Sequence, residues 1–474
     1  MFTLSDIVQG SGDTLQIQST TPLDPQLVFR AAHHDSRQIE PGDLFIAIKG
    51  ANVDGHRFIP AVARAGALGA LCTTPVEDVP PDFLQIVVPD VVAALQATAR
   101  VRTQRQENTT LIGITGSNGK TSTKEAVAAV LSRKAPTLKT QASYNNEIGY
   151  PLTLLRLEPQ HRYAVLEMGA QWVGELAWLS STIAKPDWSI ITNIGASHLE
   201  FFGSQERVII AKTELVQVLS SSGIAILNYD DPNVRAMSAS TQASVLYYGL
   251  GKGAEVRAMD TDGDTVFGRN FTLRYHNQKR SIQLHFPGEH GVSIALAAAA
   301  AGCAAGISLD EIGIALEALL PAKGRGEIKA GPNGSIIIDD TYNANRQSII
   351  AITQAMHATK QFPMGKRWAV LGDIFELGPF AKDEHMTSGA ALAGNIDYLV
   401  ALGDKARYYV EGAIAAGMPQ EHIYFFSADV ENAPEVEAAK RAVADLLKHE
   451  VQRGDLVLLK GSRGMRFETL ITLL

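Results

Sequence analysis

Short, uninterrupted apolar runs recur through the middle and last parts of the chain. The middle part contains TLIGIT (110–115), YAVLEMG (163–169), WSIITNIG (188–195) and GIAILNYDD (223–231). The last part contains SIIIDD (335–340), RWAVLGD (367–373), DYLVALGD (397–404), HIYFFS (422–427) and DLVLLKGS (455–462). Such runs are typical of strands buried on both faces in parallel sheets covered by helices. We therefore predict an α/β fold, in which ligands bind beyond the carboxyl ends of the strands.

Two stretches of the sequence weakly indicate boundaries between domains. At about 100–200 residues per domain, 474 residues correspond to two to four domains. The stretch RTQRQENTT (102–110) is polar and precedes the first apolar run, and PAKGRGE (321–327) is rich in Pro and Gly. We expect a small N-terminal α/β domain (1–107), a central domain with a mostly parallel, phosphate-loop-type sheet flanked by helices (108–321), and a C-terminal Rossmann-like α/β domain (322–474).

Composition narrows the classes of function. The net charge is −8, from 42 basic and 50 acidic residues, and the basic residues are scattered, which argues against a nucleic-acid surface. The start MFTLSDIVQG is unlike a secretory signal. The run VSIALAAAAAGCAAGISL (292–309) is mostly Ala and Gly, so we expect a tightly packed buried helix and no membrane span. Cys72 and Cys303 indicate neither a disulfide framework nor a cysteine metal site, which fits a reducing cytoplasm.

The segment GSNGKTS (116–122) has the features of a phosphate-binding loop. It lies between an apolar run and the predicted helix KTSTKEAVAAVLSRK (120–134). Backbone N–H groups at the start of a helix attract anions, Lys120 would supply charge to the outer phosphates, and Thr121 an oxygen to Mg²⁺. The spacing G-x-x-G-K-T is shorter than the common G-x-x-x-x-G-K-[ST], because Ile114 stands where the first glycine should be. A Gly-rich turn with an exposed Lys is the simpler alternative, which the strand–loop–helix order disfavours.

Polar side chains follow the other apolar runs of the middle part. They are Glu167, Asn193, His198, Asn228, Asp230 and Asp231. If the strands are parallel, these groups share one edge of the sheet with Lys120. Oxygen ligands with one imidazole suit Mg²⁺ better than zinc. Each of these residues alone is more simply explained as a solvated or core residue than as a metal ligand. Only their joint position at one edge of the sheet favours a metal site.

The loop GSNGKTSTKE resembles the ATP loop of the Mur ligase family, whose own spacing is G-x-x-G-K-[ST]. SYNNEIGYPLTLL (143–155), LEMGA (166–170), ASHLEFFGS (196–204) and AKTEL (211–215) follow in the order of that family. DSRQIEPGDLFIAIKGANVDGHRF (35–58) is similar to its UDP-sugar-binding domain. DDTYNANRQS (339–348), LGDIFELG (371–378) with His385, and LLKGSRG (458–464) resemble the member that adds a dipeptide. The resemblance covers essentially the whole chain.

This resemblance implies an ATP-dependent, ADP-forming ligase of peptidoglycan synthesis. It would join D-alanyl-D-alanine (D-Ala-D-Ala) to UDP-N-acetylmuramoyl-tripeptide through an acyl phosphate, as a cytoplasmic monomer without nucleic-acid partners. One alternative is a family member that adds a single amino acid, although the D-N-P-R type stretch of the diaminopimelate- or lysine-adding ligase is missing here. The other is a non-catalytic ATP-binding partner, which need not keep Lys120, Glu167, His198 and Lys212. Whether the tripeptide ends in diaminopimelate or lysine stays open.

The resemblance also implies roles for individual residues. The catalytic set would be Lys120, Glu167, His198 and Lys212. ATP would contact Gly116, Ser117, Asn118, Gly119, Lys120, Thr121, Ser122, Arg325 and Asp340. Two Mg²⁺ ions would use Thr121, Glu167, His198 and Lys212, with Lys212 as a carbamate. The UDP-linked substrate would meet Ser36, Arg37, Asn145 and Asn146, and we assign the dipeptide to Tyr342, Asn343, Asn345 and Arg463 as our own interpretation.

Two positions depart from the family pattern. Gly291, in GEHGVSIALAA (288–298), stands where the family usually has an Asn associated with the adenine. We therefore assign no adenine contact to Gly291. Thr213 stands where Gly is commoner, which leaves the geometry beside Lys212 open.

Overall fold

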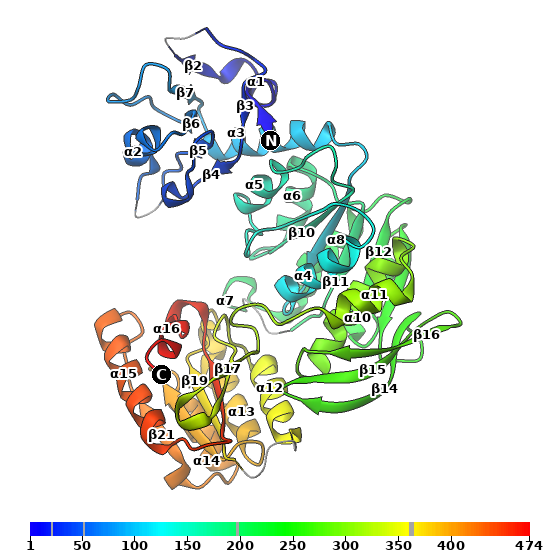
Figure 1. Cartoon of the computed structure of the whole chain (residues 1–474), viewed down its shortest axis with the longest axis vertical. Coiled ribbons are helices and arrows are strands. Elements are labelled where there is room, and N and C mark those ends of the chain that lie inside the picture. The colour runs from blue at the N-terminus through cyan, green and yellow to red at the C-terminus, as the bar shows by residue number, and fades with distance from the viewer. Residues whose placement is uncertain (20–21, 51–52, 196–198, 360–364) are drawn as a thin grey trace.

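A computed structural model describes the chain except residues 20–21, 51–52, 196–198 and 360–364. The molecule is elongated, with the N-terminal segment at one end, the last segment at the other and the middle segment between them (Figure 1). The described strands form sheets of two, five, nine and six strands.

The N-terminal segment is built on a small mixed sheet. Its order is β2 (Gln16–Gln18), β7 (Leu84–Val87), β6 (Gly69–Cys72), β5 (Leu44–Ile46) and β4 (Ala32–His33). The pairs from β4 to β7 are parallel, whereas β2 is antiparallel. β1 (Phe2–Thr3) and β3 (Val28–Phe29) form a separate antiparallel pair. The helices are α1 (Leu4–Ser11), α2 (Ile59–Arg64) and α3 (Val91–Gln104), and α3 packs on α1 and leads to the central sheet.

The central sheet confirms the four apolar runs predicted as strands in the middle part. β9 (Thr137–Lys139), β10 (Tyr163–Glu167), β8 (Thr110–Thr115), β11 (Trp188–Ile191), β12 (Ile224–Asn228) and β13 (Ser244–Gly249) pair in parallel. β14 (Val256–Thr265), β15 (Gly268–Tyr275) and β16 (Gln278–Leu284) extend it as an antiparallel meander, which the sequence analysis did not foresee. The helices of this part are α4 (Lys120–Leu131), α5 (Gly149–Leu154), α6 (Glu175–Thr182), α7 (Leu199–Phe202), α8 (Gln205–Gln217), α9 (Pro232–Ala236), α10 (Gly288–Ala304) and α11 (Leu309–Glu317).

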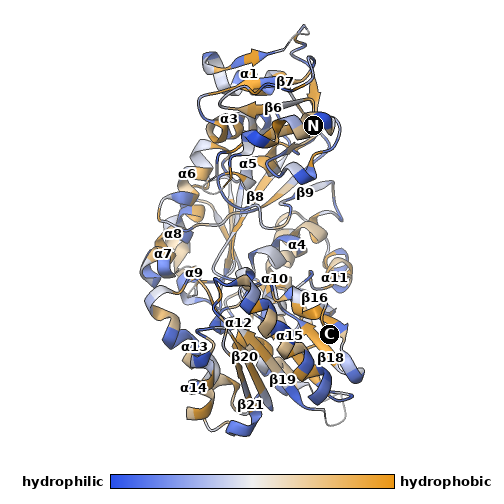
Figure 2. Cartoon of the chain, turned by 90° about the vertical axis from the view of Figure 1, so that its left-hand side faces the viewer, coloured by the Kyte–Doolittle hydropathy of each residue, from blue (hydrophilic) through white to orange (hydrophobic). Residues whose placement is uncertain are grey.

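The last segment confirms the other five runs. Its sheet has the order β17 (Glu327–Ala330), β18 (Ile336–Asp339), β22 (Leu456–Lys460), β19 (Arg367–Gly372), β20 (Tyr398–Leu402) and β21 (Ile423–Phe426). All its pairs are parallel except β17 with β18. Helices α12 (Arg346–Ala358), α13 (Ala381–Leu392), α14 (Arg407–Ala415), α15 (Ala433–Glu450) and α16 (Glu468–Ile471) surround it, and its strands are hydrophobic (Figure 2). The α/β class is confirmed, while the boundaries at 107 and 321 stay predictions.

The alanine-rich run forms α10, the helix expected to be buried. Ala297 to Ala301 are fully buried, and α10 packs along α4, the helix that follows the phosphate loop. Small residues allow this approach, because a Cβ on Gly302 would lie 2.6 Å from Val130 Cγ1. Among the described residues, no helix is long and apolar enough to cross a membrane.

A hairpin of the central sheet reaches into the last segment. Its tip residue Val266 is 1% exposed and belongs to the same core as Ile349, Ile352 and Met356 of α12. The Val266 N–H also donates a hydrogen bond of 3.0 Å to Thr359 Oγ1. The central and last sheets are therefore held together by the chain at 321–326 and by this buried hairpin tip.

The packing of α10 leads to a stability prediction. Replacing Ala298 by Leu should lower the free energy of unfolding by about 1–3 kcal/mol, because the interface with its neighbours has no room for three more carbon atoms. Denaturant unfolding of the full chain measures it. The same change at exposed Ala438 of α15 is the control and should have little effect. Equal stability of the two variants would contradict the close packing of α10.

Candidate active site

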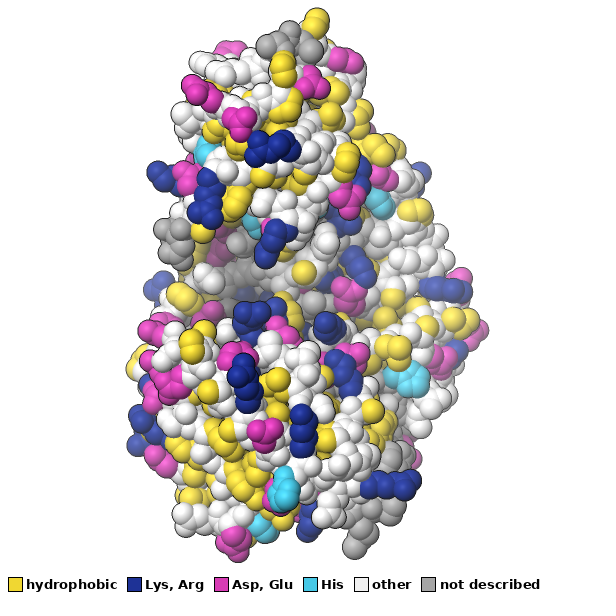
Figure 3. Space-filling model, turned by 60° about the vertical axis from the view of Figure 1, so that its left-hand side comes forward, with side chains coloured by type: hydrophobic (Ala, Val, Ile, Leu, Met, Phe, Trp, Pro, Cys, Tyr) yellow, Lys and Arg dark blue, Asp and Glu magenta, His cyan; other side chains and the backbone are white. Residues whose placement is uncertain are grey.

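A cavity of about 440 Å³ lies at the carboxyl ends of strands in both large sheets. Its walls come from the phosphate loop, from residues after β9 and β10, from the start of α10, and from the last segment around 325–352 and residue 460. The molecule is hollowed across its middle, and Lys and Arg side chains gather around this hollow (Figure 3). The cavity is where the two α/β parts meet, as expected for a ligand site in such folds.

The phosphate loop is held against the end of β11. Gly116 has φ 143°, and a Cβ there would lie 2.0 Å from Thr192 Oγ1, so a larger residue does not fit. The Asn118 N–H donates to Asn193 Oδ1 at 3.0 Å, and Thr192 Oγ1 donates to the Asn118 carbonyl at 2.6 Å. Ser117 to Ser122 line the cavity, whereas Gly116 does not. The loop with the short G-x-x-G-K-T spacing is thus complete, and its shape depends on contacts with the end of the neighbouring strand β11.

Lys120, the first residue of α4, bends back over this loop. Its Nζ donates hydrogen bonds to the carbonyls of Gly116 at 2.8 Å and Ser117 at 3.3 Å. Burial lowers the pKa of Lys120, while the charge of Glu167 raises it. The Lys120 side chain therefore places a positive charge beside the N-terminus of a helix. Its hydrogen-bond partners are neutral carbonyl groups, which a bound anion can replace.

Glu167, at the end of β10, carries a buried oxygen that has no hydrogen bond among the described residues. The residue is 1% exposed, and its Oε1 accepts a hydrogen bond from Asn145 Nδ2 at 2.8 Å. Its Oε2 is buried without a hydrogen bond among the described residues, and Lys124 Nζ lies 3.9 Å away. A buried carboxylate oxygen without a hydrogen bond, whose neighbouring ammonium lies as far as 3.9 Å away, would be stabilised by a cation bound directly to it. Together with the Thr121 hydroxyl on the same cavity, this oxygen donor set fits Mg²⁺.

His198 and Lys212 are the other two residues predicted as metal ligands. His198 lies outside the described residues. Lys212, in α8, is 1% exposed and does not line the cavity; its Nζ lies 5.8 Å from the centre of the Phe202 ring. Burial and, to a smaller extent, the charge of Lys120 lower the pKa of Lys212 to about 7. Among the described residues, no group of three or more His, Cys, Asp or Glu could hold a metal ion.

The remaining polar residues at this edge stabilise loops. Asn193 holds the phosphate loop, and Asn228 Nδ2 donates to the Thr192 carbonyl at 2.8 Å. Asp231 accepts from the Ile194 N–H at 2.7 Å and caps α9, and Asp230 accepts from two backbone N–H groups after β13. These four do not line the cavity, so the expectation that they join Lys120 in a metal site is wrong.

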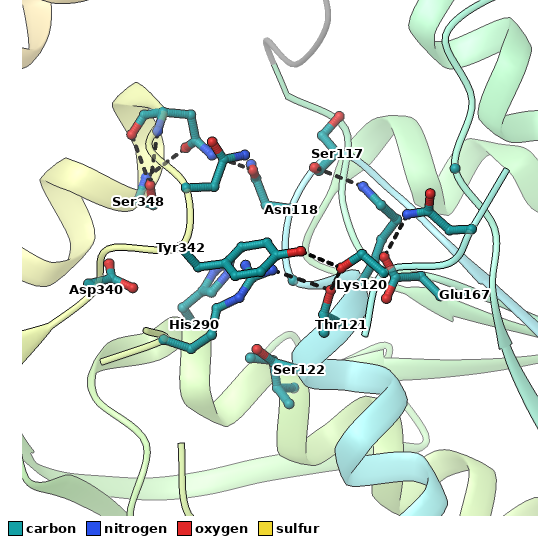
Figure 4. A pocket seen from close by; sticks show the side chains of 18 of the residues that line it. Ser117, Asn118, Lys120, Thr121, Ser122, Glu167, His290, Asp340, Tyr342 and Ser348 are labelled. Atoms are coloured by element: carbon teal, nitrogen blue, oxygen red, sulfur yellow. Dashed lines mark hydrogen bonds between the residues drawn. The ribbon is translucent and has the colours of Figure 1, made fainter. Parts of the chain in front are cut away.

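The last segment supplies the opposite wall of the cavity, which Arg325 and Tyr342 both line. Arg325 donates to Thr121 Oγ1 at 3.3 Å, and its guanidinium lies 4.0 Å from the centre of the Tyr342 ring. The Tyr342 hydroxyl is 2.7 Å from Ser143 Oγ, and Asn345 Nδ2 donates to Asn118 Oδ1 at 2.6 Å. Figure 4 shows Tyr342 directed across the cavity toward the loop. Residues 199 to 227 positions apart in the sequence thus form one site.

Asp340 and Lys460 occupy adjacent strand ends on this wall. Lys460 is 2% exposed, and its Nζ donates to Asp340 Oδ2 at 2.6 Å and to the Asn343 carbonyl at 2.8 Å. Lys460 and Ser143 also line the cavity but were not predicted as site residues, although both belong to the segments LLKGSRG and SYNNEIGYPLTLL that resemble the family. A lysine that ends an otherwise apolar strand was the available signal for Lys460.

The predicted substrate residues fall into two groups. Asn145, Asn146, Asn343 and Asn345 line the cavity, whereas Ser36, Arg37 and Arg463 do not. Arg37 is exposed and pairs with Asp35, but its neighbour Gln38 donates to the Tyr144 hydroxyl at 3.3 Å, directly before Asn145. Arg463 lies 5.5 Å from the centre of the Tyr342 ring and pairs with Glu468. Arg463 therefore lies beyond the cavity but next to Tyr342, which lines it. The Ser36–Arg37 turn also lies beyond the cavity, and its neighbour Gln38 contacts Tyr144, which directly precedes the lining residue Asn145.

Known protein families match all three parts of the chain. Residues 114–302 match the model of the Mur ligase middle domain, residues 324–463 that of the Mur ligase glutamate ligase domain, and residues 30–129 that of the Mur ligase family catalytic domain. A UDP-N-acetylmuramoyl-tripeptide–D-alanyl-D-alanine ligase from Bacillus subtilis is 34% identical, over 94% of this chain and 93% of the relative. The ligase of that name from Escherichia coli is 35% identical, over 92% of each.

Solved structures agree with this assignment. A crystal structure of the ligase MurF from Acinetobacter baumannii has a TM-score of 0.84 and 32% identity, covering 99% of this chain and 98% of that one. MurF from Thermotoga maritima, in complex with ADP, has a TM-score of 0.77 and 27% identity, covering 94% and 97%. The chain therefore belongs to the Mur ligase family.

Proposed function

We propose that the chain is an ATP-dependent, ADP-forming ligase that joins D-Ala-D-Ala to UDP-N-acetylmuramoyl-tripeptide. The observation that carries the proposal is the cavity itself. It brings the phosphate loop, the Glu167 carboxylate and Arg325 from the last segment into one space, and one Glu167 oxygen has no hydrogen bond among the described residues. The names of relatives at 31–36% identity over most of the chain support the substrates. We retain 1–107, 108–321 and 322–474 as the units for the UDP-linked substrate, ATP and the acceptor.

The first chemical step activates a carboxylate. One of its oxygens attacks the γ-phosphorus of ATP, the bond from that phosphorus to the bridging oxygen breaks, and ADP leaves with the electron pair. The negative charge on the transferred phosphoryl group must be balanced during the whole transfer, and correctly positioned cations provide most of that balance. The Lys120 ammonium can exchange its hydrogen bonds to the loop carbonyls for hydrogen bonds to the phosphates. Arg325 would contact the phosphates from the opposite wall of the cavity. The product is an acyl phosphate.

The second step forms the amide. The uncharged amine of the acceptor attacks the acyl carbon, inorganic phosphate leaves, and the nitrogen loses a proton. Water would compete with the amine, so the acyl phosphate must be sheltered. The contacts of Tyr342 with Ser143 and of Asn345 with Asn118 show that the last segment can cover the phosphate loop closely.

Thr121 and Glu167 would hold Mg²⁺, and we propose that His198 completes a second site. When bound, the metal supplies positive charge to phosphate oxygens. Lys212 is suited to become a carbamate, because with a pKa of about 7 much of it is neutral amine at neutral pH and can add CO₂. The change would convert a buried cation into an anionic ligand and so lower the electrostatic cost of burying Lys212 near Lys120.

The substrates would lie along a path from the N-terminal segment to the last one. We assign the uridine end to Ser36 and Arg37, and the following part to Asn145 and Asn146. The acceptor dipeptide would meet Tyr342, Asn343 and Asn345, with Arg463 toward its carboxylate. We further propose that the protein acts as a monomer in the cytoplasm.

Lys120 provides the first test of the phosphate site. Lys120→Ala should lower kcat by about a hundred- to a thousandfold, roughly 3–4 kcal/mol, because a positioned charge on the transferred group is lost. Phosphate release with ATP and both substrates measures it. Lys185→Ala, at an exposed position, is the control. Near-normal turnover of a folded Lys120→Ala protein would end the phosphate-loop interpretation.

Lys212 gives a prediction about pH and CO₂. Because its pKa is lowered to about 7, the neutral amine grows from roughly one tenth at pH 6 to nine tenths at pH 8. Adding bicarbonate to CO₂-depleted enzyme should therefore restore activity more fully at pH 8 than at pH 6. Lys212→Ala should be inactive, and short carboxylic acids should recover part of its activity. Full activity of CO₂-depleted wild-type protein would exclude a functional carbamate.

The acceptor decides between members of the family. Phosphate release with UDP-N-acetylmuramoyl-tripeptide and ATP should be fast with D-Ala-D-Ala and slower by several powers of ten with L-Ala-L-Ala or single amino acids. A site that pairs the amide and carboxylate of the dipeptide rejects partners that leave its own polar groups unmatched. Equal or better rates with free lysine or diaminopimelate would reassign the protein to the single-amino-acid activity.

A further inference from the structure

The Asn118 side chain, in the middle of the phosphate loop, is held by the start of α12. Asn345 Nδ2 donates a hydrogen bond to Asn118 Oδ1 at 2.6 Å, and Asn118 Nδ2 donates one to Gln347 Oε1 at 2.8 Å. Figure 4 shows Asn118 directed from the loop toward the segment that contains Ser348. Both polar atoms of this amide group are therefore bonded to residues 227 and 229 positions further along the chain.

The backbone of Asn118 is held by the central sheet instead. Its N–H donates to Asn193 Oδ1 at 3.0 Å, and its carbonyl accepts from Thr192 Oγ1 at 2.6 Å and from Asn193 Nδ2 at 3.2 Å. If the last segment moves away, these backbone contacts stay and only the contacts of the amide group are lost. Asn118 is thus a junction at which the last segment binds the phosphate loop itself.

Gln347 is placed to make this contact and not to touch a ligand. It does not line the cavity, whereas Asn345 does. The Gln347 side chain covers Gly195, because a Cβ on Gly195 would lie 2.5 Å from Gln347 Oε1. Asn345 has a further structural role, since its Oδ1 accepts from the Ser348 N–H at 2.9 Å and caps α12. Gln347 is therefore the residue through which the contact can be altered without changing a cavity wall.

Docking of the last segment also determines how enclosed the phosphate loop is. Across the cavity, Arg325 donates to Thr121 Oγ1 at 3.3 Å, and the Tyr342 hydroxyl lies 2.7 Å from Ser143 Oγ. A nucleotide with its phosphates on the loop would lie between these two walls. Each contact that keeps the last segment docked therefore opposes the release of that nucleotide.

We propose that Gln347 is a positioning residue that retains the nucleotide indirectly: by accepting the hydrogen bond of the Asn118 amide, it keeps the last segment docked on the phosphate loop and slows the release of ADP. The inference rests on the proposed function and adds a residue to it. One hydrogen bond between neutral groups changes an equilibrium constant by about two- to tenfold. Because such coupling is reciprocal, a bound nucleotide also favours docking.

The first test measures ADP binding to the full-length protein with Mg²⁺, by stopped-flow displacement of a ribose-labelled fluorescent ADP. Gln347→Met keeps the length of the side chain but removes the acceptor oxygen. It should raise the dissociation rate constant about two- to tenfold. The association rate constant should stay the same, because ADP enters while the last segment is undocked. A dissociation rate constant equal to that of the wild type would overturn the proposal.

Gln354→Met is the matched control, because Gln354 is an exposed glutamine of the same helix. It should leave both rate constants unchanged. An equal rise in dissociation for Gln354→Met and Gln347→Met would assign the effect to α12 as a whole and overturn the proposal.

A double-mutant cycle tests whether Gln347 acts through Asn118. In an Asn118→Ala background, Gln347→Met should have no further effect on ADP dissociation, since the hydrogen bond is already absent. If the effects of the two substitutions multiply, Gln347 acts elsewhere and the proposal is wrong. These rates require neither the UDP-linked substrate nor the acceptor. Coupled effects in a protein that forms no amide would therefore count against the proposed function alone, and multiplicative effects in an active ligase against this inference alone.

Discussion

The close approach of Gly116 to Thr192 is the contact on which the site depends. With a Cβ on residue 116 only 2.0 Å from the Thr192 hydroxyl, the loop can lie against the end of β11 solely because glycine is there. That approach lets Thr192 and Asn193 bind the backbone of Asn118 and fix the start of α4. The N–H groups and Lys120 are thereby aimed into the cavity before any ligand arrives. Preorganisation of this kind is what makes charged groups effective on phosphates.

Two buried charges near the loop are incompletely matched by the protein. Glu167 keeps an oxygen without a hydrogen bond among the described residues, and Lys212 is an almost fully buried amine whose pKa falls to about 7. Such arrangements cost folding free energy, so they are typical of functional sites. Both would be relieved by what the proposed chemistry brings, a divalent cation at the carboxylate and a carbon dioxide at the amine.

The sequence was most informative where a single local pattern decides the structure. Uninterrupted apolar runs predicted nine strands correctly, and Gly116 to Thr121 predicted the loop, because burial and backbone geometry act within a few residues. The meander β14–β16 was missed, since its alternating polar residues carry no comparable signal. Strand-end position alone was also too weak a guide. It identified Glu167, but the carboxylates of Asp231 and Asp230 accept hydrogen bonds from backbone N–H groups of the loops after β11 and β13. Ser143 and Lys460 join the site through packing between segments, which no local pattern encodes.

The hairpin tip at Val266 has a mechanical consequence. The polar contacts across the cavity, such as Asn345 with Asn118, exchange readily with ligand or water, whereas Val266 is embedded in the core of the last segment and leaves it at the cost of exposing apolar surface. Together with the covalent crossing at 321–326, it gives the last segment a second connection to the central sheet. Any separation of the two segments at the meander would have to withdraw Val266 from that core and expose its apolar surface to water. The antiparallel meander thus opposes separation of the segments at a place well away from the chain crossing.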